Sequence, residues 1–165
     1  MAEQQEQGDF ERWVAALQEA ILERERELFS AKVLEEARCP QNMRVMLGPD
    51  GHALLVGSCG DVMEMFLRVS DARIENAAFM TDGCGPTVAC GSMLTRMAQG
   101  RTLEAAAAIE AADLIMALDG LPPEHIHCAT LAVQTLQQAM DACSPRSEER
   151  NETMEDTSKR ELSQP

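Results

Sequence analysis

Three cysteines lie in local sequences that bend the backbone and can turn a thiol out of the core. Cys59 lies in Gly-Ser-Cys-Gly-Asp, Cys84 in Asp-Gly-Cys-Gly-Pro, and Cys128 in His-Ile-His-Cys after Leu-Pro-Pro-Glu. None belongs to a CxxC pair, which argues against a zinc ribbon and against a thioredoxin-like redox pair. Thiolates gathered from distant segments, with a carboxylate and an imidazole nearby, are ligands that suit an iron–sulfur cluster or zinc.

A carboxylate and an imidazole accompany these thiols in the sequence. Asp61 follows Cys59 by two residues, and in an extended chain such side chains point to the same face, so both are predicted to share one metal site. His127 directly precedes Cys128, so it is expected to point elsewhere and to act as an alternative or supporting ligand. His125 is interpreted as an ordinary surface histidine, and the alternative is a supporting position behind the ligands.

The predicted backbone around two of the thiols has chemical consequences. Cys84 stands between Gly83 and Gly85 at a junction from strand to helix, where glycine permits a close approach of the backbone to a sulfide or an anion. Cys128 falls in the first turn of the last predicted helix, where the helix dipole lowers a thiol pKa. The other three cysteines are expected to be unligated; they are Cys39, Cys90 and Cys143.

The overall charge excludes some classes of partner. The 165 residues contain 14 basic and 28 acidic side chains, and the formal net charge is −14. This balance argues against binding to nucleic acid or to an anionic membrane surface.

No apolar run approaches the roughly 20 residues that cross a bilayer. The acidic start has no apolar signal segment. A cytoplasmic protein with reduced thiols is expected.

An amphipathic helix is predicted near the start of the chain. From residue 10 onward, apolar side chains recur with the spacing of one helical face; they are Phe10, Trp13, Val14, Leu17, Ile21 and Leu28. Asp9 is the expected N-cap, and residues 1–8 are expected to lie outside the helix. The helical pattern should end by Arg38, because Cys39 precedes a proline.

The next part of the chain has the pattern of a sheet. Alternating apolar residues over 43–47 indicate an extended segment, and 48–51 resemble a turn. Strands are predicted over 52–56, 62–69 and 74–81. Three consecutive strands with short links form an antiparallel meander, which needs helices to cover one face.

Helical patterns follow, which makes the predicted fold α+β. They cover residues 86–99, 103–109 and 111–118, and a last helix contains the apolar stripe from Ala129 to Met140. Residues 144–165 nearly lack large apolar side chains and are predicted to be a disordered polar tail.

Three ordered motifs resemble the U-type iron–sulfur cluster scaffold family, which comprises IscU and the N-terminal domain of NifU. The motifs are Cys59-Gly60-Asp61-Val62-Met63, Gly83-Cys84-Gly85, and Leu121-Pro122-Pro123 closely followed by Ile126-His127-Cys128. Residues 29–33 and the Cys39-Pro40-Gln41-Asn42 segment after them also resemble the opening helix of the family. The resemblance covers about residues 29–142 and implies an α+β fold, with a three-stranded antiparallel sheet flanked by helices.

The resemblance also implies a function and a ligand set. Such a scaffold accepts sulfur from a cysteine desulfurase, assembles a labile [2Fe–2S] cluster and transfers it to apo iron–sulfur proteins; it is not a turnover enzyme. The implied ligands are Cys59, Cys84 and Cys128, with Asp61 and His127 as variable or assisting positions. Cys128 is the candidate persulfide acceptor. The chain is then divided into an N-terminal extension (1–28), a scaffold domain (29–143) and the tail (144–165).

The chain departs from the family pattern in two ways, and two other functions are open to the same residues. The family's Leu-Pro-Pro segment continues with Val-Lys, whereas this chain has Glu124 and His125, which argues against the Hsp70-type chaperone that the family implies as a partner. The N-terminal extension and the tail are additional. Because zinc also suits these thiolates, the alternatives are a zinc-bound sulfur acceptor that activates a desulfurase and a structural zinc module for protein interaction.

Overall fold

The computed structural model describes residues 2–143, so the tail predicted over 144–165 lies outside the described residues. The elements in chain order are α1 (Ala2–Leu28), α2 (Ala31–Arg38), β1 (Gly51–Val56), β2 (Val62–Ser70), β3 (Arg73–Thr81), α3 (Gly85–Ala98), α4 (Leu103–Ala107), α5 (Ala111–Ala117), a short 3₁₀ helix η1 (Pro123–His125) and α6 (Ile126–Asp141).

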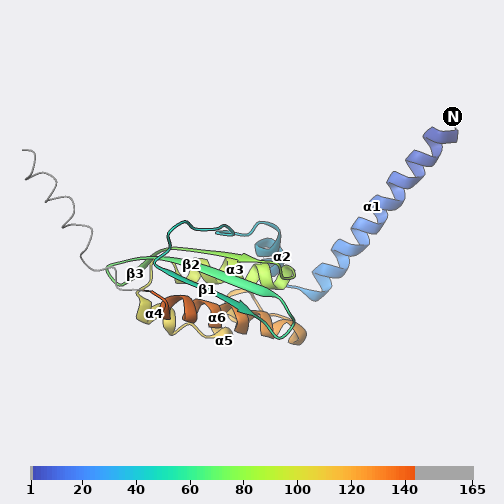
Figure 1. The fold of residues 1–165 in the computed structure, drawn as a ribbon. Coiled ribbons are helices and arrows are strands. Elements are labelled where there is room, and N and C mark those ends of the chain that lie inside the picture. The colour runs from blue at the N-terminus through green and yellow to red at the C-terminus, as the bar shows by residue number, and fades with distance from the viewer. Residues whose placement is uncertain (1, 144–165) are drawn as a thin grey trace, which may run out of the picture.

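The three strands form one antiparallel meander in the order β1-β2-β3. Met63, Met65 and Leu67 alternate along β2 and are completely buried, because this face of the sheet is covered by helices. Figure 1 shows α6 running along the sheet, and α3 follows directly after β3. The predicted α+β fold with a three-stranded sheet is confirmed.

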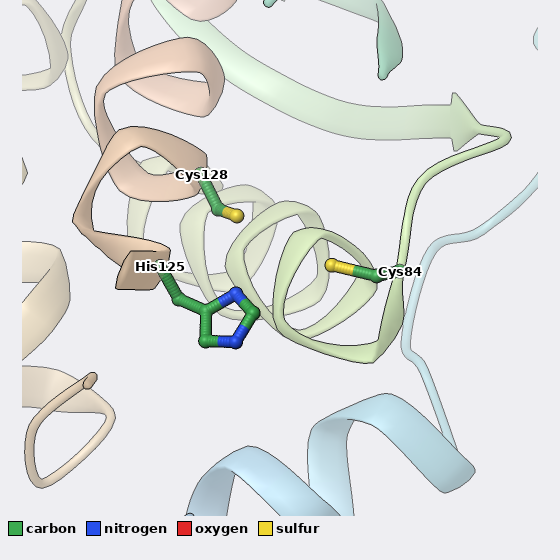
Figure 2. A group of neighbouring side chains, drawn as sticks. All are labelled: Cys84, His125 and Cys128. Carbon is green, nitrogen blue, oxygen red and sulfur yellow. The ribbon is translucent and has the colours of Figure 1, made fainter. Parts of the chain in front are cut away.

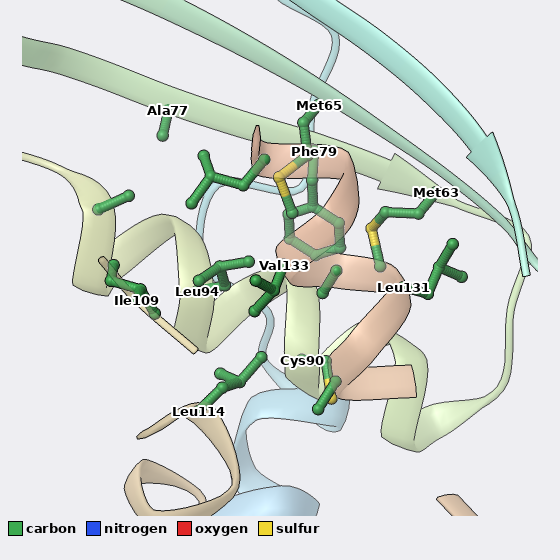
Figure 3. Close-up of a cluster of buried hydrophobic side chains, with 14 of the residues drawn as sticks. Met63, Met65, Ala77, Phe79, Cys90, Leu94, Ile109, Leu114, Leu131 and Val133 are labelled. Carbon is green, nitrogen blue, oxygen red and sulfur yellow. The ribbon is translucent and has the colours of Figure 1, made fainter. Parts of the chain in front are cut away.

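The core lies between this face of the sheet and helices α3 and α6. In Figure 3, Phe79 of β3 and Met65 of β2 point toward Leu94 of α3 and Val133 of α6. Phe79 is the largest fully buried side chain, and methionine, leucine and alanine supply most of the remaining packing. Methionine fills irregular gaps well, so this core closes with few aromatic residues.

Helix α1 extends away from this core (Figure 1). It begins at Ala2, so the prediction that Asp9 caps it is wrong: the polar residues 2–9 continue the helix. Ser30 caps α2 by accepting a hydrogen bond from the Val33 amide at 3.1 Å, which separates the two helices. The predicted apolar stripe is helical but exposed, and Trp13 is 61% exposed. The stripe therefore belongs to no core within the described residues.

The segment predicted as extended over 43–47 is not a strand. Met43 makes a single parallel bridge to Phe79, and the Arg44 amide donates to the Phe79 carbonyl at 3.0 Å. The alternating apolar pattern ends in side chains that face solvent, and Leu47 is 88% exposed. The segment follows the outer edge of β3 and returns at Asp50, whose amide donates to the Leu67 carbonyl at 2.8 Å. None of the described helices combines the length and apolar composition needed to cross a membrane.

Candidate metal centre

The loop between β1 and β2 carries the first two predicted ligands. Its backbone closes with a hydrogen bond from the Gly57 amide to the Asp61 carbonyl at 2.8 Å, and Gly60 adopts a positive φ of 91°. Cys59 and Asp61 therefore share a tight turn rather than the extended segment that the i and i+2 argument assumed. They still meet, because the Cys59 thiol donates a hydrogen bond to the Asp61 carboxylate.

The third predicted ligand, Cys84, is the N-cap residue of α3 and is exposed. The residue before it, Gly83, has to be glycine because the site is closely packed there. A Cβ on Gly83 would lie 2.6 Å from Asp61 Oδ2 and 2.7 Å from Thr87 Cγ2, distances that side chains do not tolerate. A Cβ on Gly85 would meet only Ala37 at an ordinary 3.7 Å. Of the two glycines, only Gly83 is required by close packing, and it packs against side chains of the site. The expected approach of the backbone to a sulfide or an anion stays a prediction.

Cys128 is the third residue of α6 and is buried, with only 1% of its surface exposed. Its position in the first helical turn is confirmed, but the expected lowering of its pKa is wrong. Burial raises the pKa of the Cys128 thiol to about 11, and the hydrogen bond with Thr87 offsets only part of this effect. Desolvation of the thiolate outweighs the helix dipole here. Deprotonation at neutral pH therefore requires a metal ion or another charge partner.

The hydroxyl of Thr87 joins these segments into one site. It lies 2.6 Å from Asp61 Oδ2, 3.2 Å from Cys128 Sγ and 3.4 Å from Cys84 Sγ. Thr87 is completely buried, one helical turn after Cys84 on α3. Sequence reasoning missed this residue. The available signal was its i+3 spacing from Cys84, which places both side chains on one face of the first turn.

The hydrogen bonds around Asp61 favour its charged form. The Thr87 hydroxyl is the largest cause of a lowered pKa for the Asp61 carboxyl, followed after an opposing desolvation effect by the Cys84 backbone amide, the Cys59 thiol and the charge of His127. The structure thus brings Asp61 together with Cys59, Cys84 and Cys128. An ionised carboxylate beside three thiols is a donor set for iron or zinc.

Two histidines precede Cys128, and the structure places both of them near its thiol. His127 is placed near the site, with Nε2 3.5 Å from Cys128 Sγ. However, one ligand atom each from Cys84, His125 and Cys128 lie within 4.8 Å of one another. Figure 2 shows the His125 ring turned toward the two thiols. His125 is therefore not a plain surface residue. The missed signal was its spacing of three residues before Cys128, which places both on one face of a helical turn.

The remaining cysteines stay outside this group. Cys90 is completely buried on α3 and its thiol pKa is raised, first by burial and then by the nearby Cys128 and Cys84. Cys143 Sγ donates to the Ala139 carbonyl at 3.4 Å, and Cys39 is exposed at the end of α2. Cys90 thus lies behind the site without joining the three residues that could hold a metal ion.

Comparisons of the sequence agree with this arrangement. A family profile described as the NifU-like N terminal domain matches residues 28–150. The chain is 38% identical over 115 residues to the protein named iron-sulfur cluster assembly scaffold protein IscU 1 of Archaeoglobus fulgidus, a match that covers 68% of this chain and 74% of that protein. It is 36% identical over 117 residues to IscU of Escherichia coli (strain K12), which covers 68% of this chain and 91% of that protein.

Solved structures share the fold of the domain. A crystal structure titled only as a hypothetical protein has a TM-score of 0.57 and 27% identity, and the match covers 67% of this chain and 95% of that chain. The N-terminal part of a NifU-like protein from Brucella abortus has a TM-score of 0.54 and 17% identity, and the match covers 72% of this chain and 95% of that chain. Fold, motif order and matched sequence agree, and the chain belongs to the family of NifU-like N-terminal domains.

Proposed function

We propose that this chain is an iron–sulfur cluster assembly scaffold. It accepts sulfur from a cysteine desulfurase, assembles a labile [2Fe–2S] cluster and transfers it to apo iron–sulfur proteins. The observation that carries the proposal is the convergence of Asp61, Cys84 and Cys128 on the single Thr87 hydroxyl, with the Cys59 thiol on Asp61. Relatives at 36–38% identity are named as such scaffolds, which supports the same role.

The proposed cluster ligands are Cys59, Cys84 and Cys128, with Asp61 as the exchangeable fourth and His127 as the assisting position. Two bridged irons need four protein ligands to complete their tetrahedra. A carboxylate oxygen is a harder donor than a thiolate and holds a sulfide-bridged iron less firmly. Cys59 and Cys84 are exposed, so the proposed site opens to a partner protein. An exchangeable ligand in an open site suits a cluster that must be released.

Sulfur enters by thiol–persulfide exchange at Cys128 in this proposal. The Cys128 thiolate attacks the terminal sulfur of the desulfurase persulfide, forms a new persulfide and releases the desulfurase thiolate, so no net oxidation occurs. Reduction of that sulfur to sulfide then requires two electrons from an external donor. The pKa of about 11 means that Cys128 must be deprotonated before it reacts: its proton goes to solvent or to a basic group of the partner, and a bound metal ion or a positive charge of the partner stabilises the thiolate.

The proposed role is that of a binding scaffold and not of a turnover enzyme. Its partners are the desulfurase and the recipient apoproteins, and a cytoplasmic location fits free thiols. An Hsp70-type chaperone is not part of the proposal, because Glu124 and His125 replace the residues expected after Leu-Pro-Pro. Zinc in the same residues is the second candidate, favoured by the group of Cys84, His125 and Cys128. The chain would then be a zinc-bound sulfur acceptor or a structural zinc module.

Anaerobic reconstitution with iron, cysteine and a desulfurase tests the function. A scaffold develops the absorption of a [2Fe–2S] cluster and passes it to apo-ferredoxin. Persulfide turnover with zinc retained favours the zinc-bound acceptor, and neither activity favours the structural module. Serine at Cys59, Cys84 or Cys128 should abolish a stable cluster, because hydroxyl is a poor ligand for iron in a sulfide cluster. Serine at Cys39, Cys90 or Cys143 is the matched control, and equal loss in Cys90→Ser would contradict the assignment.

A further inference from the structure

One buried nitrogen in the described part of the chain lacks a hydrogen-bond partner. It is Nδ1 of His125, which is inaccessible to solvent. Buried polar atoms are almost always paired, and an unpaired one costs about 1–3 kcal/mol. The ring is held in place: its centroid lies 5.4 Å from that of Phe29, and the His125 amide donates to the Pro122 carbonyl at 2.8 Å. A nitrogen fixed in this way without a protein partner is available to bind a ligand.

The surroundings of His125 identify the kind of ligand. Its ligand atom, Cys84 Sγ and Cys128 Sγ all lie within 4.8 Å of one another. Bond lengths of about 2.3 Å to sulfur and about 2.0–2.1 Å to nitrogen place neighbouring donors of a tetrahedral zinc site roughly 3.5–3.8 Å apart. If the distances between these three ligand atoms shorten by about one ångström, the atoms occupy three corners of such a site. Thr87, within 3.4 Å of both sulfurs, also holds Asp61, so the fourth corner faces the loop of residues 57–61.

We propose that His125 is a metal ligand of this chain, and that its Nδ1 binds a single tetrahedral divalent ion together with the thiolates of Cys84 and Cys128. The fourth position is left to the loop that carries Cys59 and Asp61. The proposal deepens the proposed function by naming an imidazole ligand of the same site. Binding transfers no electrons: the two thiol protons go to solvent, and the neutral imidazole keeps its proton on Nε2.

His127 has a different task in this arrangement. Its Nε2 lies 3.5 Å from Cys128 Sγ, and the coordinating group of three contains His125 and not His127. Adjacent residues at a helix start project about 100° apart, whereas residues three apart share a face. His125 and Cys128 can thus bind one ion from the same side. His127 supports the Cys128 thiolate through a hydrogen bond.

Titration with Co²⁺ alone tests this ligand without a desulfurase, because tetrahedral cobalt bound to sulfur and nitrogen gives intense visible bands. We expect His125→Ala to weaken Co²⁺ binding by at least about 100-fold and to shift these bands, since removal of even a supporting group costs about 10–100-fold. The matched control His127→Ala removes only a supporting hydrogen bond and should lose about 10-fold, the lower end of that range. Circular dichroism verifies that both variants fold. Equal affinities for His125→Ala and wild type, or a larger loss in His127→Ala, would overturn the proposal.

A second measurement needs no variant. Nitrogen-15 NMR of the histidine rings in the wild-type chain, with and without Zn²⁺, distinguishes a metal-bound from a protonated nitrogen. The expected result is a zinc-dependent shift of His125 Nδ1, and an unchanged His125 ring in the zinc-loaded chain would refute the assignment. Failure here is separable from failure of the proposed function: a wild-type chain that assembles a cluster while His125 never binds metal rejects the ligand alone.

Discussion

At the scale of single residues, the candidate site is organised by Thr87, whose side chain is not a proposed ligand. One hydroxyl carries one proton and is shared among a carboxylate oxygen and two sulfurs at 2.6, 3.2 and 3.4 Å. Its proton goes to Asp61, the strongest acceptor of the three, and this hydrogen bond is the largest cause of the lowered Asp61 pKa. Thr87 thereby holds a charged carboxylate beside the thiols before any metal ion arrives.

Removal of this hydroxyl gives the first prediction. Thr87→Val keeps the shape of the side chain but loses the hydrogen bond, so the pKa of Asp61 should rise toward its ordinary value and stability should fall by about 1–3 kcal/mol. Thr87→Ser retains the hydroxyl and serves as the control. Carbon-13 NMR titration of the Asp61 carboxyl measures the pKa directly. A lowered pKa that persists in Thr87→Val would show that other donors hold the carboxylate.

The two glycines around Cys84 provide the second prediction. Gly83→Ala should displace Asp61 and Thr87, because the new methyl group would overlap both. We expect Co²⁺ affinity to fall by at least about 10-fold as a result. Gly85→Ala meets open space apart from Ala37 and should bind like the wild type. Equal losses in the two variants would mean that flexibility near Cys84, and not close packing, is what the site requires.

At the scale of elements, α1 differs from every other helix that the structure describes. Its apolar stripe is exposed and has acidic side chains on both sides, and the helix ends at residue 28, where the family match begins. The contacts that tie it to α2 include the exposed ion pair between Arg38 and Glu25 at 2.7 Å, and such pairs contribute little. The domain boundary predicted after residue 28 agrees with this weak connection and stays a prediction.

Trp13 makes this boundary testable, because it is the one tryptophan of the chain and is 61% exposed. Its fluorescence should have the emission of a solvated indole and should change little when urea unfolds the domain. Deletion of residues 1–28 should leave the free energy of unfolding, measured by urea titration with circular dichroism, within about 0.5 kcal/mol of the value for the full chain. A blue-shifted emission that moves with the domain transition would instead show that the stripe is covered in solution.

At the scale of the whole molecule, the candidate site reaches into the core through Cys128, while Cys59 and Cys84 are exposed. Cys128 and Cys90 are both buried and both belong to the main hydrophobic cluster, on α6 and α3. Figure 3 shows Cys90 beside the packed side chains of these helices. A metal bound at Cys128 is therefore in direct contact with the packing that holds the two helices together. Metal binding and domain stability should be linked for this reason.

The buried thiols also predict how stability depends on pH. The folded-state pKa of Cys128 is raised to about 11 and that of Cys90 is raised further, both above the ordinary value of 9.0. The protonated thiols thus contribute stability that is fully present below about pH 9 and is lost as the pH rises toward 11. Urea unfolding at a series of pH values measures the loss. Cys90→Ala should flatten the slope between pH 9 and 11, and an unchanged slope would assign the effect to other groups.

The local pattern of residues was sufficient for much of the fold. Period-2 and period-3.6 apolar spacing predicted the three strands of the meander and the helices after them, because one face of each had to be buried. The sequence motifs also indicate Cys59, Asp61, Cys84 and Cys128, and the structure brings these four residues together. Their role as ligands stays a prediction.

Tertiary structure decided the features that depend on neighbours far along the chain. The segment over 43–47 alternates like a strand, yet it finds a partner on β3 only at Met43. Burial raised the Cys128 pKa against the local helix dipole, because desolvation depends on everything packed around the thiol. Thr87 and His125 belong to the site because the packing of the domain places the starts of α3 and α6 beside the β1–β2 loop. Sequence spacing gives the direction of a side chain on its own element, and packing decides what that side chain meets.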